Sequence, residues 1–145
     1  MTKKSFRIAA MAVLVNDRNQ VLIGSSPRDG GFKFPQGGLE PNEDAITGIK
    51  RELNEELGII VTDNDILLFD NEQVEYLYPA KDPYYIYKGQ RLSVIKIQYN
   101  SSMQLIPQDD EFDELHWIQP VELKNFDVGF RLKAYQRALQ ICDLL

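Results

Sequence analysis

The sequence predicts a layered α/β protein in which a mixed β-sheet lies between helices. Two observations support this prediction. Short runs of β-branched and apolar residues, separated by turn-forming residues, recur along the chain and are typical of strands. They alternate with two longer segments whose apolar residues recur every three or four positions, as in amphipathic helices. Helices and strands interspersed in this way bury their apolar faces by packing the helices on the sheet.

The expected strands are short, and turn residues bound them. A polar segment, 16–19, separates the first two strands, and a polar segment with two glycines, 25–31, precedes a short extended piece that ends at Pro35. Near the middle of the chain the residues alternate, with Ile95 and Ile97 on one face and Lys96 on the other, which predicts a half-buried strand. Strands are therefore expected at residues 5–15, 21–24, 32–34, 93–99 and 114–118.

The first helix is expected to begin after Pro41. Asn42 would be its N-cap, with Glu43 and Asp44 in the first turn, where acidic side chains are favourable. Gly58 stands where a left-handed C-terminal cap would fall. The apolar stripe of this helix is formed by Ile46, Ile49, Leu53 and Leu57.

The second helix is expected over 131–145 and should pack on the sheet. Its apolar stripe is formed by Leu132, Tyr135, Leu139 and Cys142. Cys142 is the only cysteine, so an internal disulfide is excluded, and its helical setting indicates a role in the core. The only histidine, His116, stands beside Trp117 in an expected strand, which favours packing over catalysis.

Composition limits the class of protein. At 145 residues the chain is expected to form a single domain, 1–145, with a continuous core. No apolar run has the roughly 18 residues that span a bilayer, and the composition suits a cytoplasmic protein. The net charge of −6 argues against a protein that grips long stretches of nucleic acid, because polyanion binding needs a broad basic face. Any phosphate-rich ligand must therefore be held locally.

Three glutamates crowd the end of the first helix. Glu52 faces both Glu55 and Glu56, and like charges at these spacings are destabilising, as are acids near a helix C-terminus. An acidic run is often a solvated surface, but here no lysine follows four residues after Glu52 or Glu55. Carboxylates clustered in this way suit Mg²⁺ or Mn²⁺. The pattern therefore predicts a divalent cation site.

Glycines on either side of this helix extend the site. They allow a tight loop to approach the acidic flank and to offer backbone carbonyls as further ligands. Such a unit supports phosphoryl transfer to water, in which the metal neutralises a diphosphate and a carboxylate accepts a proton from the attacking water.

The same segment resembles the signature of a known family. From Gly37 to Ile59 it matches at every fixed position the Nudix box, G-x5-E-x7-R-E-U-x-E-E-x-G-U, where U is aliphatic. So many fixed positions make chance a poor explanation. The matching residues are Gly37, Glu43, Arg51, Glu52, Leu53, Glu55, Glu56, Gly58 and Ile59. The resemblance implies an α/β/α sandwich and a hydrolase that cleaves a nucleoside diphosphate linked to another moiety.

The resemblance also implies a role for each matching polar residue. Glu52, Glu55 and Glu56 correspond to the metal ligands, and Glu56 is also the candidate for activating water. The carbonyl of Gln36 or Gly37 would complete the metal site. Arg51 and Glu43 correspond to the pair that braces the loop against the helix.

Four further motifs resemble the branch that contains RNA pyrophosphohydrolases and dinucleoside polyphosphate hydrolases. They are FPQGG at 34–38, YKGQR at 87–91, EFDELHWI at 111–118 and GFRLKAY at 129–135. The resemblance implies that Glu111 reaches the metal site from a loop and is an alternative general base. Glu111 could instead be one acid of a solvated acidic loop.

The resemblance also implies that Phe130 stacks on the first base of the substrate. Arg131 would be the polar residue beside this ring. Phe130 could equally be a core residue that leads into the last helix. Arg7 corresponds to a phosphate-contacting arginine, or it is an exposed strand residue. Arg28 falls in a loop where the branch carries basic residues.

Two features depart from the branch. Phe32 stands where a tryptophan often precedes FPQGG, and the basic C-terminal tail of some relatives is missing. The expected function is hydrolysis of 5′-triphosphorylated RNA. The alternatives are hydrolysis of dinucleoside polyphosphates or nucleoside triphosphates, and a non-catalytic nucleotide sensor. Homodimers are common among relatives, but no stretch of this chain identifies an interface.

Overall fold

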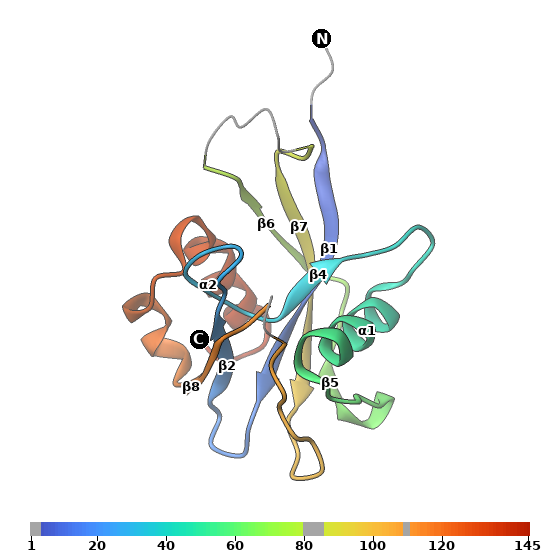
Figure 1. Ribbon diagram of the computed structural model, residues 1–145, viewed down its shortest axis with the longest axis vertical. Coiled ribbons are helices and arrows are strands. Elements are labelled where there is room, and N and C mark those ends of the chain that lie inside the picture. Colours follow the sequence, from blue (N-terminus) through green and yellow to red (C-terminus); the bar gives the residue numbers. More distant parts are fainter. Residues whose placement is uncertain (1–3, 80–85, 109–110) are drawn as a thin grey trace.

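The computed structural model of the protein describes residues 4–79, 86–108 and 111–145. Within these ranges the chain forms one mixed sheet with a helix on either face (Figure 1). The strands are β1 (Phe6–Val15), β2 (Val21–Ser25), β3 (Phe32–Lys33), β4 (Gln36–Gly38), β5 (Ile66–Leu68), β6 (Gln73–Leu77), β7 (Gly89–Gln98) and β8 (Glu114–Ile118). The helices are α1 (Ala45–Leu57) and α2 (Leu132–Ile141), and 3-10 turns lie at Asp63–Asp65, Pro120–Asn125 and Gly129–Arg131.

The sheet is built around β1 and β7, which run parallel. They pair along their whole length, from Phe6 opposite Gly89 to Val15 opposite Gln98. The other strand pairs are antiparallel, in the order β3-β2-β1-β7-β5, with β4 paired to β1, β6 to β7 and β8 to β2. The predicted mixed sheet is confirmed.

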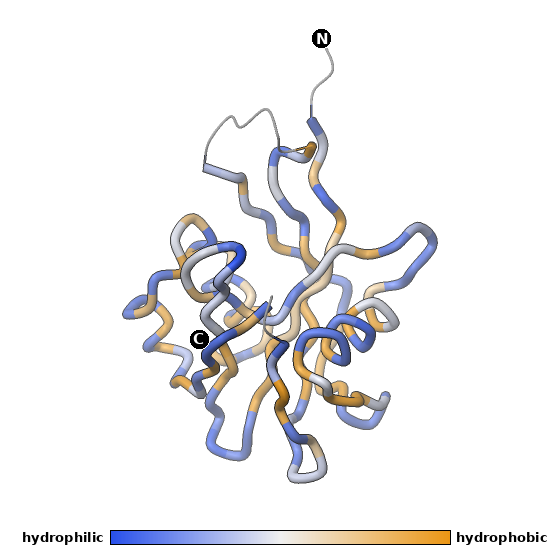
Figure 2. The backbone as a smooth tube through the Cα atoms, viewed as in Figure 1, coloured by the Kyte–Doolittle hydropathy of each residue, from blue (hydrophilic) through white to orange (hydrophobic). Residues whose placement is uncertain are grey.

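The two helices cover opposite faces of the sheet, because alternate residues of β1 point to opposite sides. Met11 and Val13 belong to the core that contains Tyr135 of α2. Ala12 and Leu14 belong to the second core, which contains the α1 stripe Ile49, Leu53 and Leu57. The predicted α/β/α sandwich is therefore confirmed. Hydrophilic residues gather in turns at the ends of the sheet, such as 16–20 and 40–44 (Figure 2).

The beginning of α1 differs from the prediction. Asp44, and not Asn42, is the N-cap, and its carboxylate accepts a hydrogen bond from the backbone N–H of Thr47 at 2.7 Å. Asn42 has a φ of 65°, so it belongs to the preceding turn. Glu43 is drawn away from the helix start by Arg51, which is the physical reason for the later cap. The C-terminal prediction is confirmed, since Gly58 is left-handed with a φ of 69°.

The other differences concern short or long-range elements. β8 has the predicted bounds, whereas β7 begins at Gly89, four residues earlier than expected. The short strands β4, β5 and β6 were not predicted, and α2 ends at Ile141. Cys142 is buried, as predicted. Neither helix in the described part of the chain has the length and apolar run that spanning a bilayer requires.

Candidate active site

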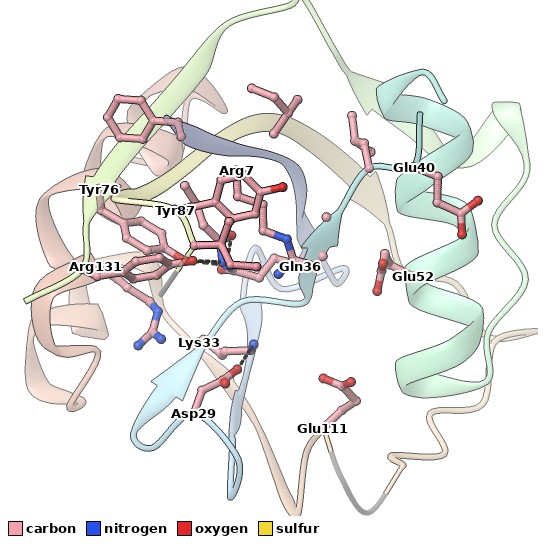
Figure 3. Close-up of a pocket in the computed structure, with 18 of the residues that line it drawn as sticks. Arg7, Asp29, Lys33, Gln36, Glu40, Glu52, Tyr76, Tyr87, Glu111 and Arg131 are labelled. Carbon is pink, nitrogen blue, oxygen red and sulfur yellow. Dashed lines mark hydrogen bonds and ion pairs between the residues drawn. The ribbon is translucent and has the colours of Figure 1, made fainter. Parts of the chain in front are cut away.

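A cleft of 1340 Å³ opens between α1, β4 and the aromatic residues of β6 (Figure 3). One end is acidic and is lined by Glu52, Glu55 and Glu111. The other end is lined by aromatic side chains and Arg131. The cleft can therefore take a ligand that is apolar at one end and anionic at the other.

Glu56 does not line the cleft, but it lies buried one helical turn after Glu52 and is the most unusual side chain near the acidic end. It is only 1% exposed, and neither carboxylate oxygen has a hydrogen-bond partner among the described residues. Burial, reinforced by the neighbouring Glu52, raises the pKa of Glu56 to about 9. A buried carboxylate without partners is costly, so it indicates a ligand that compensates the cost.

Glu52 lies one helical turn before Glu56, and it rests directly on the backbone of β4. A Cβ atom at Gly37 would come within 2.1 Å of the Glu52 Cδ. The glycine at this position therefore lets the carboxylate approach the main chain. This contact brings the end of α1 and the predicted loop ligand together.

Arg51 holds the loop before α1 against the helix. Its Nε and Nη2 donate to the two carboxylate oxygens of Glu43 at 2.9 and 2.8 Å, and Nη2 also donates to the carbonyl of Gly38 at 3.1 Å. The Arg51 guanidinium holds the pKa of the Glu43 carboxyl at about 2. The arrangement matches the brace that the sequence predicts between these two residues.

Arg51 also lies beside the acidic run, where the sequence had indicated that no lysine relieves the crowding of the glutamates. Its Nη1 lies 3.0 Å from Glu52 Oε1 and 3.4 Å from Glu55 Oε2. Arg51 precedes Glu55 by four residues, so the relieving charge lies before the acids and not after them. Glu56, in contrast, has no hydrogen-bond partner in the described residues, and the nearby charge of Lys33 only partly offsets the rise that burial causes in its pKa.

Glu111 and Arg28 were predicted for separate roles, but the structure joins them. Arg28 donates to both carboxylate oxygens of Glu111, at 3.1 and 3.0 Å. Arg28 also lies 3.4 Å from Asp29, and Asp29 pairs with Lys33 at 2.6 Å. A chain of alternating charges thus crosses the cleft, from Lys33 through Asp29 and Arg28 to Glu111.

The donor set fits a hard divalent cation, although it is not assembled as a closed centre. Among the described residues no three His, Cys, Asp or Glu side chains are close enough to form one. Glu55 and Glu111 are in ion pairs with arginines, whereas Glu56 keeps two unpartnered oxygens at the site. Carboxylate oxygens, a nearby main chain and an unsatisfied buried charge are what Mg²⁺ or Mn²⁺ would use.

The aromatic end of the cleft is formed by Phe130, Tyr76 and Tyr78. The Phe130 ring is 39% exposed, and its centroid lies 5.4 Å from that of Tyr76 and 6.3 Å from that of Tyr78. The Arg131 guanidinium carbon lies 4.4 Å from the Phe130 centroid, and its buried Nε has no hydrogen-bond partner in the described part of the chain. Phe130 is therefore a surface of the cleft and not a core residue.

Gln36 supports this aromatic end through its side chain. Its Nε2 donates to the Tyr76 hydroxyl at 2.8 Å and to Gln90 Oε1 at 3.2 Å, and its Oε1 accepts from the Tyr135 hydroxyl. Gln90 in turn donates to the Tyr78 hydroxyl at 3.1 Å. The sequence argument assigned only a backbone carbonyl to Gln36, so this second contribution is new.

Arg7 lies over β4, between the two ends (Figure 3). It is exposed and makes no ion pair or hydrogen bond with a described residue. A Cβ at Gly38 would come within 2.5 Å of its Nε, so this glycine makes room for the guanidinium. Arg7 is thus positioned to meet an anionic ligand.

Sequence reasoning missed several residues that line the cleft, namely Asp29, Lys33, Tyr76, Tyr78 and Gln90. For the tyrosines a signal was available, because Val74, Tyr76 and Tyr78 alternate as in a strand. For Lys33 no local signal was available, since its place depends on a contact with the β2–β3 loop.

The fold and this cleft define a class of protein, an α/β/α hydrolase with a carboxylate-rich site for an anionic substrate. Comparison with known families agrees, because the NUDIX domain profile matches residues 5–138. The chain belongs to the Nudix hydrolase family. It is accordingly a pyrophosphohydrolase that acts on phosphoric anhydrides.

Individual relatives are distant. An RNA pyrophosphohydrolase of Francisella tularensis subsp. mediasiatica (strain FSC147) is 28% identical over 144 residues, covering 94% of this chain and 93% of that protein. The E. coli dihydroneopterin triphosphate pyrophosphohydrolase structure matches with a TM-score of 0.74 at 17% identity, covering 94% of this chain and 97% of its own. A C. elegans Ap4A hydrolase structure matches with a TM-score of 0.63 at 16% identity, covering 91% and 95%. The two structures show a shared fold.

Proposed function

We propose that the protein hydrolyses the 5′-triphosphate end of RNA to a 5′-monophosphate, releasing pyrophosphate or successive phosphates, and so initiates RNA decay. The observation that carries the proposal is the cleft itself, in which an aromatic end and a carboxylate-rich end are joined by cationic side chains. The Francisella relative, named RNA pyrophosphohydrolase, supports the same substrate.

The aromatic end would hold the first base of the RNA. Phe130 offers an exposed ring face, and Arg131 lies beside it with an unused N–H. Stacking tolerates any base, which suits an enzyme that acts on many transcripts. Arg7 would then contact the phosphates that follow the base.

The acidic end would carry out the chemistry. Glu52, Glu55, Glu56 and Glu111, with the carbonyl of Gln36 or Gly37, would hold Mg²⁺ or Mn²⁺. A bound divalent cation neutralises the diphosphate and makes water a better nucleophile. Glu56 would accept the proton of the attacking water, and Glu111 is the alternative base.

A smaller substrate is the second candidate. The net charge is −6, and the cleft lining contains more acidic than basic residues, so the site suits a free nucleotide better than a long polyanion. Dinucleoside polyphosphates and nucleoside triphosphates fit this description.

One experiment separates the two candidates. The protein is incubated with Mg²⁺ and, in turn, with 5′-triphosphorylated RNA, diadenosine polyphosphates and nucleoside triphosphates, and the rates and products are compared. The proposal requires the highest kcat/KM for RNA and a 5′-monophosphate product. Faster turnover of dinucleoside polyphosphates or nucleoside triphosphates would favour the second candidate.

A further inference from the structure

Strand β3 places a single lysine inside the cleft. Lys33 is 4% exposed, whereas its neighbour Phe34 points to the opposite face and lies in the core beneath α2. Lysine is rarely buried to this degree without a function or a partner. Lys33 lines the cleft, so its amine faces the space in which a ligand would lie.

Asp29 fixes the direction of the amine. The Lys33 Nζ donates to Asp29 Oδ2 at 2.6 Å, and no other hydrogen bond from this amine reaches a described residue. An ammonium group has three donors, so two remain for a ligand. Asp29 also accepts from Arg28 Nε at 3.4 Å, and its backbone N–H donates to Ser26 Oγ at 3.1 Å, so two further contacts position the aspartate.

The position of Lys33 between the two ends of the cleft indicates what it binds. Figure 3 shows Lys33 between Arg131 at the aromatic end and Glu52 and Glu111 at the acidic end. A nucleotide with its base at the aromatic end and its scissile anhydride at the acidic end must pass its first phosphate over this region. Arg28 already donates from all three of its nitrogens, to Asp29 and Glu111. Among the described residues Lys33 makes one hydrogen bond, to Asp29, and so remains as a cation with free donors on this side of the cleft.

We infer that Lys33 binds the phosphate attached to the nucleoside, and that it does so without a metal ion. The inference rests on the proposed function only in its use of a nucleotide with its base at the aromatic end. A buried, pre-oriented amine loses little conformational entropy on binding, so a single contact has a measurable effect. It follows that a nucleoside 5′-monophosphate should bind better than its nucleoside even when divalent cations are removed.

The test measures binding of AMP and GMP, each against its own nucleoside, by calorimetry in the presence of EDTA. The wild-type protein should prefer the monophosphates. Lys33→Met should weaken monophosphate binding about tenfold, the effect of losing one charge-assisted hydrogen bond, and leave nucleoside binding unchanged. Lys33→Arg should retain much of the preference, because it keeps the charge.

Lys50→Met is the matched control. Lys50 also pairs with an aspartate, Asp63, at 2.5 Å, but it lies on α1 outside the cleft lining. Its removal should leave monophosphate binding unchanged. This control separates a local contact with phosphate from the general loss of one positive charge.

Asp29→Asn distinguishes phosphate binding from a structural role of the ion pair. This variant keeps the cation and removes a negative charge from the cleft, so monophosphate binding should be equal or tighter. If Lys33 served only to pair with Asp29, both Lys33→Met and Asp29→Asn would weaken binding alike, and that result would overturn the inference. Should Lys33→Met fail to fold, Asp29→Asn alone decides, because it should leave monophosphate binding equal or tighter if Lys33 binds the phosphate, and should weaken it if Lys33 serves only to pair with Asp29.

The test is independent of RNA hydrolysis. If AMP and GMP bind the wild-type protein no better than their nucleosides, the inference on Lys33 is wrong even where RNA is turned over. If RNA is not turned over but the preference for monophosphates depends on Lys33, the inference stands and the RNA proposal fails.

Discussion

At the scale of single residues, Glu56 is a side chain whose burial lowers the stability of the folded protein and whose proposed role is in catalysis. Its carboxylate is buried without a hydrogen-bond partner among the described residues, in a helix that already carries Glu52 one turn earlier. Such a group lowers the stability of the metal-free protein as the pH rises, because burial makes its ionisation costly and the folded protein must hold it protonated. A bound cation would remove this cost.

The first prediction concerns the pH dependence caused by Glu56. The unfolded chain releases this proton near pH 4.5 and the folded chain near pH 9, so between these values the folded protein binds the extra proton. Its free energy of unfolding without metal should therefore fall as the pH rises through this range. Glu56→Gln should remove this part of the slope, as measured by urea unfolding in EDTA at several pH values.

The same substitution should abolish most of the activity. Loss of a general base costs about 10²–10⁴-fold in turnover, and under the proposed function Glu56→Gln would also remove a metal ligand. Glu55→Gln is the control for the pH effect, because Glu55 is 59% exposed and should leave the slope unchanged. Unchanged turnover in Glu56→Gln would remove the basis of the proposed chemistry.

The second prediction concerns Gly37. A methyl group there would displace the Glu52 carboxylate, which lies at the end of a flexible side chain, so Gly37→Ala should leave the melting temperature nearly unchanged. Turnover should nevertheless fall about 10²-fold, because small displacements of catalytic groups have effects of this size. On a Glu52→Gln background the same change should add little, since both substitutions affect one group. If the losses in turnover caused by Gly37→Ala and Glu52→Gln were additive in the double variant, the assigned contact between Gly37 and the Glu52 carboxylate would be contradicted.

At the scale of elements, α1 and the loop before it behave as one unit. Arg51 connects Glu43, the Gly38 carbonyl and the two glutamates that follow, so a single guanidinium sets the relative position of loop and helix. Asp44 caps the helix because Glu43 is engaged by this arginine. The order of these polar residues thus decides both where the helix begins and where its acids point.

The third prediction tests this unit. Glu43→Gln should destabilise the protein by about 1.5–3 kcal/mol at pH 7, the usual effect of a hydrogen bond to a charged group. The depressed pKa of Glu43 sets the sign of the pH effect. Its contribution is complete above about pH 4.5 and is lost as the pH falls toward about 2, so the two proteins should converge in acid.

Urea unfolding of the two proteins between pH 2 and 7 measures this convergence. Asp63→Asn, which breaks an ion pair with an exposed aspartate, is the control and should cost under about 1 kcal/mol. A larger loss for Asp63→Asn than for Glu43→Gln would show that the brace is not the stronger contact.

At the scale of the whole molecule, charge couples ligand binding to stability. The net charge is −6, and the acidic end of the cleft concentrates part of it at Glu52, Glu55 and Glu111. A divalent cation bound there stabilises the folded state by mass action, because the unfolded chain does not hold these carboxylates together.

The fourth prediction follows from this coupling. Millimolar Mg²⁺ or Mn²⁺ should raise the melting temperature, EDTA should reverse the rise, and Glu52→Gln should reduce it strongly. Differential scanning fluorimetry measures the shift, with K⁺ at the same ionic strength as the control for screening. An equal shift with K⁺ would show general screening and no specific site.

The local elements and the family could be predicted from the sequence. The strand at 114–118, the left-handed cap at Gly58, the apolar stripe of α1 and the buried Cys142 depend on residues close together in the chain. The Nudix box also lies within one continuous segment, so its spacing could be recognised without a structure. Local propensity and periodicity carry this information.

Only the tertiary structure decided the contacts between distant segments. The pairing of Arg28 with Glu111 joins residues 83 positions apart, and the Tyr135–Gln36 contact joins residues 99 apart. The strands β4 and β6 exist because β1 and β7 pair with them, and the direction of the Lys33 amine is set by Asp29 in the preceding β2–β3 loop. Short strands and buried charges obtain their stability from such partners, so neither can be located from local sequence alone.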